Sequence, residues 1–122
     1  MLTDKERELL SGKNFVHLAT INSDGSPQVS PVWVEVEGDS IIINTAIGRA
    51  KERNVRRDPR VALSIYDQND PYNDASIRGR VVEITENAAR EHMDKLSQKY
   101  LGKPYPWHND ASHRVILKIK KV

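Results

Sequence analysis

The sequence contains no cysteine, which excludes disulfide scaffolds, thiolate zinc sites, iron–sulfur clusters and cysteine nucleophiles. Long apolar runs are also missing: aliphatic stretches such as Ile41 to Ile43 fall far short of the ~18 to 20 apolar residues that span a bilayer. The segment Met1 to Ser11 is charged and has no apolar signal core. The sequence therefore predicts a cytoplasmic protein without a membrane partner.

Neither sign of charge is in excess. The 19 basic and 17 acidic side chains leave a net charge of +2, too little for binding nucleic acid by bulk charge. With 38% hydrophobic and 30% charged residues, the 122-residue chain has the composition of a folded domain. Its length predicts a single domain over residues 1–122.

Several site motifs are absent as well. The sequence has no G-x-G-x-x-G, no P-loop and no G-x-S-x-G nucleophile elbow. Asp67 begins a stretch that resembles a calcium loop, but its twelfth position is Arg78, where a carboxylate is needed. The four histidines lack metal-ligand spacing, so we predict no metal site.

Hydrophobic periodicity predicts a mainly β protein of the α+β class. The expected strands are the six segments 15–21, 32–37, 41–45, 61–66, 77–84 and 115–120. The expected helices are a segment from the capping box Thr3-Asp4-Lys5-Glu6 to Ser11, then 50–58 and 86–101. Residues 67–74 and 102–113 read as loops. Short antiparallel-type turns favour a six-stranded Greek-key barrel with helices at its ends.

Local residues refine this picture at three points. Pro31 requires an edge, a bulge or an interruption in its strand. Gly79 marks a bulge or a close backbone approach. Trp33 lies on the charged face of its predicted strand, which suggests that this face is covered by another copy and predicts a homodimer.

The one strong charge imbalance lies between Gly48 and Arg60, where six basic residues face two acidic ones for a net charge of +4. A solvated helix face explains part of it, because Arg56 and Arg57 lie near the helix end that favours cations and Glu52 can pair with Arg56.

Arg49 and Lys51 need another explanation, because they flank the first turn of the predicted helix. There the dipole and free N–H groups favour an anion and disfavour added positive charge. A phosphate held by these groups, with the Thr45 hydroxyl donating to it, would resolve the conflict. The competing explanation is an internal carboxylate, such as Glu35 or Asp39.

Six segments then occur in an order typical of one family: 16–20, 24–27, 31–33, 44–45, 48–54 and 57–61, with the sequences VHLAT, DGSP, PVW, NT, GRAKERN and RDPRV. The chain resembles the pyridoxamine phosphate oxidase-like split β-barrel superfamily. More narrowly, it is similar to the small deazaflavin-dependent reductases that use coenzyme F-420. The resemblance covers nearly the whole chain.

The resemblance implies a split β-barrel homodimer with the cofactor in a groove between subunits. It places Thr45, Arg49 and Lys51 on the cofactor phosphate, the position that the dipole argument reached independently. The implied cofactor-binding residues are Ser30, Pro31, Val32, Trp33, Thr45, Arg49, Lys51, Arg53, Asn54, Tyr72 and Trp107. Of these, Ser30 to Trp33 would line the ring, while Tyr72 and Trp107 would come from loops near the ring or the substrate.

The implied activity is hydride transfer between coenzyme F-420 and a small unsaturated or quinone-like substrate. The cofactor carries the electronic work, so no side chain is assigned as a general acid. Three alternatives remain open: the same fold with flavin mononucleotide (FMN), a carrier that binds the cofactor without turnover, and nucleic-acid binding through residues 49–60. The last is disfavoured because no aromatic side chains are interleaved with the arginines.

Overall fold

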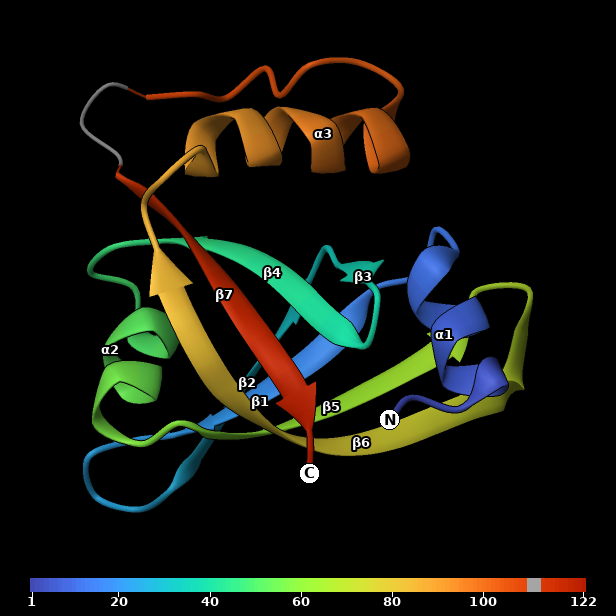
Figure 1. Ribbon diagram of the computed structural model, residues 1–122, viewed down its shortest axis with the longest axis horizontal. Coiled ribbons are helices and arrows are strands. Elements are labelled where there is room, and N and C mark those ends of the chain that lie inside the picture. Colours follow the sequence, from blue (N-terminus) through green and yellow to red (C-terminus); the bar gives the residue numbers. More distant parts are fainter. Residues whose placement is uncertain (110–112) are drawn as a thin grey trace.

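The computed structural model describes residues 1–109 and 113–122, which form three helices and a seven-stranded antiparallel sheet (Figure 1). The helices are α1 (Asp4–Ser11), α2 (Ala50–Arg57) and α3 (Ala89–Leu101). The strands are β1 (Val16–Ile21), β2 (Pro27–Val32), β3 (Glu35–Glu37), β4 (Ser40–Ala46), β5 (Arg60–Asp67), β6 (Asp70–Thr85) and β7 (Arg114–Lys121). None of these helices is long and apolar enough to cross a membrane.

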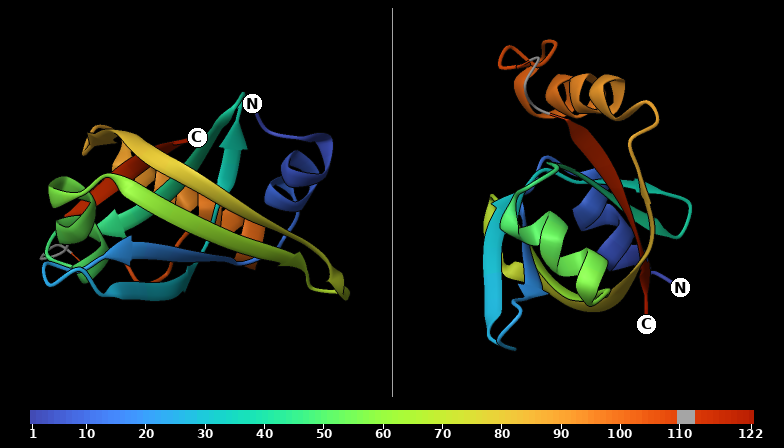
Figure 2. Two further views of the ribbon diagram at one scale, coloured as in Figure 1. Left: turned by 90° about the horizontal axis from the view of Figure 1, so that it is seen from below. Right: turned by 90° about the vertical axis from the view of Figure 1, so that its left-hand side faces the viewer.

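The strand order is β2-β1-β5-β6-β7-β4-β3, so β2 and β3 form the two edges although they are neighbours in the chain. Every pairing is antiparallel, and the sheet curls into a barrel that its edges leave open (Figure 2). This confirms the predicted antiparallel barrel, with seven strands instead of six. The expected strand 32–37 is divided because the chain crosses from one edge to the other at Trp33 and Val34. Pro31 lies on the edge strand β2, where a missing N–H donor is tolerated.

Residues 67–74 do not form the predicted loop. Tyr66 pairs with Asp74 and Asp67 with Asp70, so a tight turn joins β5 directly to the long strand β6. Tyr72 therefore lies in a strand, and it is 93% exposed. The start of β6 is exposed on both faces, so its residues remain polar and lack the alternation that reveals a strand.

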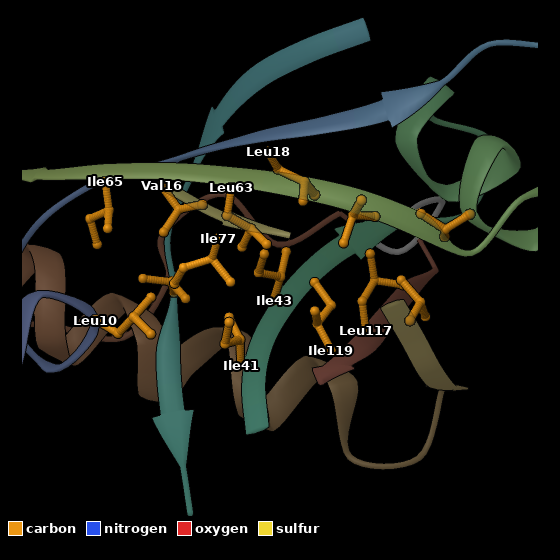
Figure 3. Close-up of a cluster of buried hydrophobic side chains, with 14 of the residues drawn as sticks. Leu10, Val16, Leu18, Ile41, Ile43, Leu63, Ile65, Ile77, Leu117 and Ile119 are labelled. Carbon is orange, nitrogen blue, oxygen red and sulfur yellow. The ribbon is translucent and has the colours of Figure 1, made fainter. Parts of the chain in front are cut away.

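Aliphatic side chains from the strands and from α1 fill the barrel interior (Figure 3). Leu18, Ile43, Ile65 and Leu117 are fully buried there. A Cβ atom added at Gly79 would lie 2.8 Å from a methyl carbon of the Ile119 side chain, which confirms the predicted close approach of two strands.

The two short helices lie at opposite ends of the barrel, and α3 lies along its side (Figures 1 and 2). The predicted capping box of α1 is present: the Glu6 N–H donates to Thr3 Oγ1 at 3.0 Å, and the Thr3 N–H donates to Glu6 Oε1 at 2.8 Å. These two bonds satisfy donors that the first turn would otherwise leave free.

The other two helices follow the predictions closely. Helix α2 ends at Arg57, just before Pro59. Helix α3 begins at Ala89, three residues later than expected, because Ala88 adopts a left-handed φ of 58°. It ends at Gly102, whose φ of 75° suits a residue without a Cβ atom.

Candidate functional site

A cavity of about 260 Å³ is lined by residues of α3 and of the start of α2, together with strand residues of the barrel. Its walls come from the end of β2, the link to β3, the end of β4, the start of β7 and the segment after α3. One part of the lining is apolar or aromatic: Phe15, Pro31, Val32, Trp33, Met93, Leu96, Tyr105 and Trp107. The other part is polar and basic: Asn44, Thr45, Arg49, Lys51 and Arg114.

The aromatic wall is built on Trp33. Its ring stacks on Tyr100 with centroids 5.1 Å apart and planes 4° apart, and Tyr105 meets it edge-on at 6.1 Å. Trp107 packs edge-on against Tyr105 and remains 64% exposed. Trp33 thus packs partly against its own chain, remains half-buried, and lines the cavity; the homodimer stays a prediction.

Two residues of α3 hold the backbone next to Trp33. The Tyr100 hydroxyl accepts a hydrogen bond from the Val34 N–H at 3.2 Å and donates to the Asn14 carbonyl at 2.6 Å. Lys99 Nζ donates to the carbonyls of Val34 at 2.6 Å and Leu10 at 2.9 Å. Burial lowers the pKa of Lys99 to about 8 and raises the pKa of Tyr100 to about 12.

The basic wall contains three cations. Arg49 is the N-cap residue of α2, Lys51 lies in its first turn and is 9% exposed, and Arg114 begins β7. Burial lowers the pKa of Lys51, and Arg49 and Arg114 lower it further. Within residues 1–109 and 113–122, no carboxylate forms an ion pair with any of the three.

The carboxylates that could have neutralised this wall are engaged elsewhere. Glu35 bonds His92 at 2.8 Å and Lys95 at 3.3 Å, while Asp39 pairs with Arg7. Within α2 itself, Glu52 accepts the Gly48 N–H at 2.8 Å and pairs with Arg56, which confirms the predicted Glu52–Arg56 pair. Glu52 therefore takes one backbone donor at this helix end but forms no ion pair with Arg49 or Lys51.

Thr45 is the hydroxyl-bearing residue of the polar and basic wall. Its side chain is 2% exposed, and Oγ1 has no hydrogen-bond partner among the residues that the structure describes. A buried hydroxyl without a partner costs about 1–3 kcal/mol. A ligand oxygen in the cavity would remove that cost.

Seven of the residues named from the sequence line this one cavity: Pro31, Val32, Trp33, Thr45, Arg49, Lys51 and Trp107. The other four lie outside the lining. Ser30 precedes the lining residue Pro31, and its buried hydroxyl has no hydrogen-bond partner among the described residues. Arg53 donates to the Gly48 carbonyl, and Tyr72 lies in the exposed start of β6. Their cofactor contacts stay predictions.

Asn54, the fourth of these residues, is buried and holds the β1–β2 turn. Its Nδ2 donates to Thr20 Oγ1 and to Asn22 Oδ1, both at 2.9 Å. Its Oδ1 accepts from Arg57 at 2.8 Å. These bonds describe a structural link between α2 and β1, and a contact with the cofactor stays a prediction.

Sequence reasoning did not name Phe15, Asn44, Met93, Leu96, Tyr105 and Arg114 as site residues, although they line the cavity. Met93 and Leu96 recur at helical spacing, which is typical of core residues, and they are buried as well as cavity-lining. Asn44 carries a usable signal, since it is a polar residue that directly follows the apolar run Ile41 to Ile43. Arg114 offers none, because one arginine before an alternating strand is common.

Comparisons with known proteins agree with this geometry. The profile of the pyridoxamine 5'-phosphate oxidase family matches residues 2–121. A solved structure named F-420 reductase shares 30% identity over 99% of this chain and 96% of its own, with a TM-score of 0.89. A conserved hypothetical protein of Mycobacterium tuberculosis is 26% identical over 99% of this chain and 81% of its own, with a TM-score of 0.76. HupZ of Group A Streptococcus, at 18% identity over 98% of this chain and 90% of its own, shares the fold with a TM-score of 0.66.

Proposed function

The chain belongs to the pyridoxamine 5'-phosphate oxidase family, and from this premise we propose that it is an oxidoreductase that uses the deazaflavin coenzyme F-420. The substrate is a small unsaturated or quinone-like compound. The cofactor phosphate lies against Thr45, Arg49 and Lys51. The similarity to a protein named F-420 reductase supports the choice of cofactor.

One observation carries the proposal: an aromatic wall and a basic wall share a single cavity. Among the described residues, no carboxylate forms an ion pair with the three cations, and the buried Thr45 hydroxyl has no hydrogen-bond partner. A flat apolar ring that ends in a phosphate has the matching chemistry. Stacking contacts suit the ring, and charge-assisted hydrogen bonds suit the phosphate. The residues present therefore fit the cofactor.

A bound deazaflavin supplies a ring that accepts or gives a hydride. The residues of the protein hold the cofactor and the substrate in position. Arg49 and Lys51 hold the anionic end, and Trp33 forms the wall against which a ring rests. The stack on Tyr100 and the bonds from Lys99 keep that wall fixed, so a substrate can be held in one orientation without a reorganisation cost at the moment of transfer.

Two alternatives share this site. FMN also combines a tricyclic ring with a phosphate, so the same two walls suit it. A protein that binds either cofactor without turnover would have the same cavity too.

Titration of the purified protein with coenzyme F-420 and with FMN, followed by cofactor fluorescence, distinguishes a deazaflavin-binding protein from an FMN-binding one. Micromolar binding of F-420 is expected. Micromolar binding of FMN together with no binding of F-420 would replace the deazaflavin by the flavin. Reduced F-420 that binds but is never oxidised by an enone, a nitroaromatic compound or a quinone would indicate a carrier.

A second copy of the chain completes the site in this proposal. At about 260 Å³ the cavity is smaller than the ~300–1,000 Å³ typical of ligand pockets, so one chain encloses only part of a ligand. The outer face of β1, β5 and β6 provides a surface for the partner. Small residues such as Ala19 and Ala62 pair there, Val29 on the neighbouring strand is 62% exposed, and the face carries hollows of about 510 and 570 Å³.

A further inference from the structure

We infer that Arg114 is a third cationic ligand for the anionic group in this cavity, and that Asn44 is the residue that positions it. The inference rests on the proposed function and extends it to two residues to which the sequence analysis assigned no role, although Asn44 lies in one of the segments that resemble the family. It follows from a chain of hydrogen bonds that runs from the cavity wall through β4 and α3 to β3.

The guanidinium of Arg114 is only partly engaged by the protein. Its Nε donates to Asn44 Oδ1 at 2.8 Å, and one terminal nitrogen approaches the Met93 sulfur at 3.3 Å, a weak acceptor. The group also lies 6.0 Å from the centre of the Tyr105 ring. Three of its five N–H donors therefore have no acceptor among the described residues, and the residue lines the cavity.

The surroundings disfavour this charge unless an anion is present. Burial lowers the pKa of Arg114, and Arg49 lowers it as well, while Tyr105 acts in the opposite direction. No carboxylate among the described residues forms an ion pair with it. A phosphate oxygen would provide both the missing acceptor and the missing negative charge.

Asn44 can adopt only one orientation. Arginine has donors and no acceptor, so the amide oxygen of Asn44 must face Arg114 Nε. The amide nitrogen then faces the Ala89 carbonyl at 2.7 Å and His92 Nδ1 at 3.0 Å, and it donates to both. A flipped amide would place oxygen against the Ala89 carbonyl and nitrogen against a donor. Asn44 is 7% exposed, so water does not compete for these bonds.

His92 continues the series of hydrogen bonds away from the cavity. Because Nδ1 accepts from Asn44, the hydrogen is on Nε2, which donates to Glu35 Oε1 at 2.8 Å. The bond from His92 is the main cause that lowers the pKa of Glu35, with Lys95 also contributing. The negative charge of Glu35 thus lies at the end of the hydrogen-bond series that is farthest from the cavity, and the group that touches Arg114 is an uncharged amide.

This arrangement explains why an amide and not a carboxylate holds Arg114. An aspartate at position 44 could accept the same hydrogen bond, but it would neutralise the guanidinium and compete with the ligand. An asparagine fixes the guanidinium and leaves its full charge to the cavity. Asn44 is therefore a positioning residue, and Arg114 is the residue that touches the ligand.

The first test uses inorganic phosphate and needs no cofactor. In protein labelled with ¹⁵N-arginine, the Nε–Hε signal of Arg114, assigned from Arg114→Lys, should shift saturably as phosphate is added. In Asn44→Leu the signal should move toward that of free arginine before any phosphate is present. A signal of Arg114 that does not respond, while backbone signals of Thr45 do, would overturn the role of Arg114. An unchanged signal in Asn44→Leu would overturn the role of Asn44.

The second test compares chromophores with and without the phosphate, FMN against riboflavin and F-420 against its phosphate-free deazaflavin. Arg114→Gln should weaken the phosphorylated form about 10- to 100-fold and change the phosphate-free form less than about twofold. Asn44→Asp should act in the same direction although it preserves side-chain shape. The matched control is Lys120→Gln, an exposed cation on the same strand, which should change neither.

The outcomes separate the inference from the function on which it rests. Equal weakening of both forms by Arg114→Gln would overturn the inference and leave the proposed function standing. If the unmodified protein binds no chromophore, the proposed function fails, and the phosphate titration still decides whether Arg114 and Asn44 form an anion site. Urea unfolding of each variant shows that the comparison is made between folded proteins.

Discussion

Lys51→Met should stabilise the ligand-free protein and weaken ligand binding at the same time. Lys51 is buried in the basic wall, where burial, Arg49 and Arg114 all lower its pKa. Its ammonium has no carboxylate partner among the described residues. Methionine keeps most of the side-chain length and removes the charge, so the folded state loses an unfavourable interaction that the unfolded state never had.

The size of the effect can be bracketed. Changes that relieve such a conflict at a functional site typically contribute about 0.5–2 kcal/mol, and we take about 1 kcal/mol. With an unfolding entropy of about 2.1 cal/mol/K per residue, a chain of 122 residues shifts its Tm by about 4 °C for each kcal/mol. The ligand-free variant should therefore melt about 4 °C above the unmodified protein at neutral pH.

Ligand should reverse this order. A ligand at 100 times its Kd stabilises the unmodified protein by about 2.7 kcal/mol. If loss of the charged contact weakens binding about 30-fold, the same concentration stabilises the variant by only about 0.9 kcal/mol. The unmodified protein should then melt about 3 °C above Lys51→Met.

Differential scanning fluorimetry with and without the phosphorylated chromophore tests whether the order of the two melting temperatures reverses. Lys120→Met is the control for loss of one exposed charge. The advantage of the variant should shrink as the pH rises toward 10.5, since Lys51 loses its charge in the folded protein before it does so in the unfolded one. A variant that melts below the unmodified protein without ligand would refute the reasoning. A gain of equal size with and without ligand would refute it too.

Three further results are expected. Between pH 8 and 10 the unmodified protein should gain stability against urea, because Lys99, with a pKa of about 8, loses its unfavourable charge in the folded state before it does so in the unfolded state. Above pH 10 it should lose stability, because Tyr100, with a pKa of about 12, ionises in the unfolded state first. Lys99→Met should remove the gain, and Tyr100→Phe should remove the loss. Asn54→Ala should cost about 1–3 kcal/mol of unfolding free energy, measured in urea, because Thr20 loses a buried donor; a changed preference for phosphorylated chromophore would in addition place Asn54 at the cofactor. Ala62→Arg should convert a dimer to a monomer in sedimentation velocity, because a twofold interface meets the substitution twice, and an unchanged dimer mass would exclude this face.

Local signals in the sequence predicted most of the fold. The capping box at Thr3 and the proline that follows α2 act within a few residues, and both helices begin or end where those signals lie. Signals failed at two points. The start of β6 has no buried face and so no alternation. The alternation of the second predicted strand does not reveal that β2 pairs with β1 at one edge of the sheet while β3 pairs with β4 at the other.

The residues of the candidate site also fall into those that the sequence reveals and those that it does not. Arg49 and Lys51 could be found because their conflict is local, with two cations at the positive end of one short helix. Arg114 could not, because its place beside Thr45 results from the pairing of β4 with β7, which joins residues about 70 positions apart. A helix-end argument can detect an anion site, but it finds only ligands that lie on the helix or a few residues before it in the sequence, such as Thr45.

The position of the cavity follows from the open edge of the barrel. Because β2 and β3 do not pair with each other, the chain between them at Trp33 and Val34 has no neighbouring strand. Side chains of α3 take over that role, since Tyr100 and Lys99 satisfy the N–H and the carbonyl of Val34. A strand that paired with this segment would have covered Trp33. Helix α3 instead contacts one side of the ring through Tyr100, and Trp33 still lines the cavity. The gap in the sheet is therefore what gives a flat ligand a wall to rest on, and α3 is the element that keeps this wall in place.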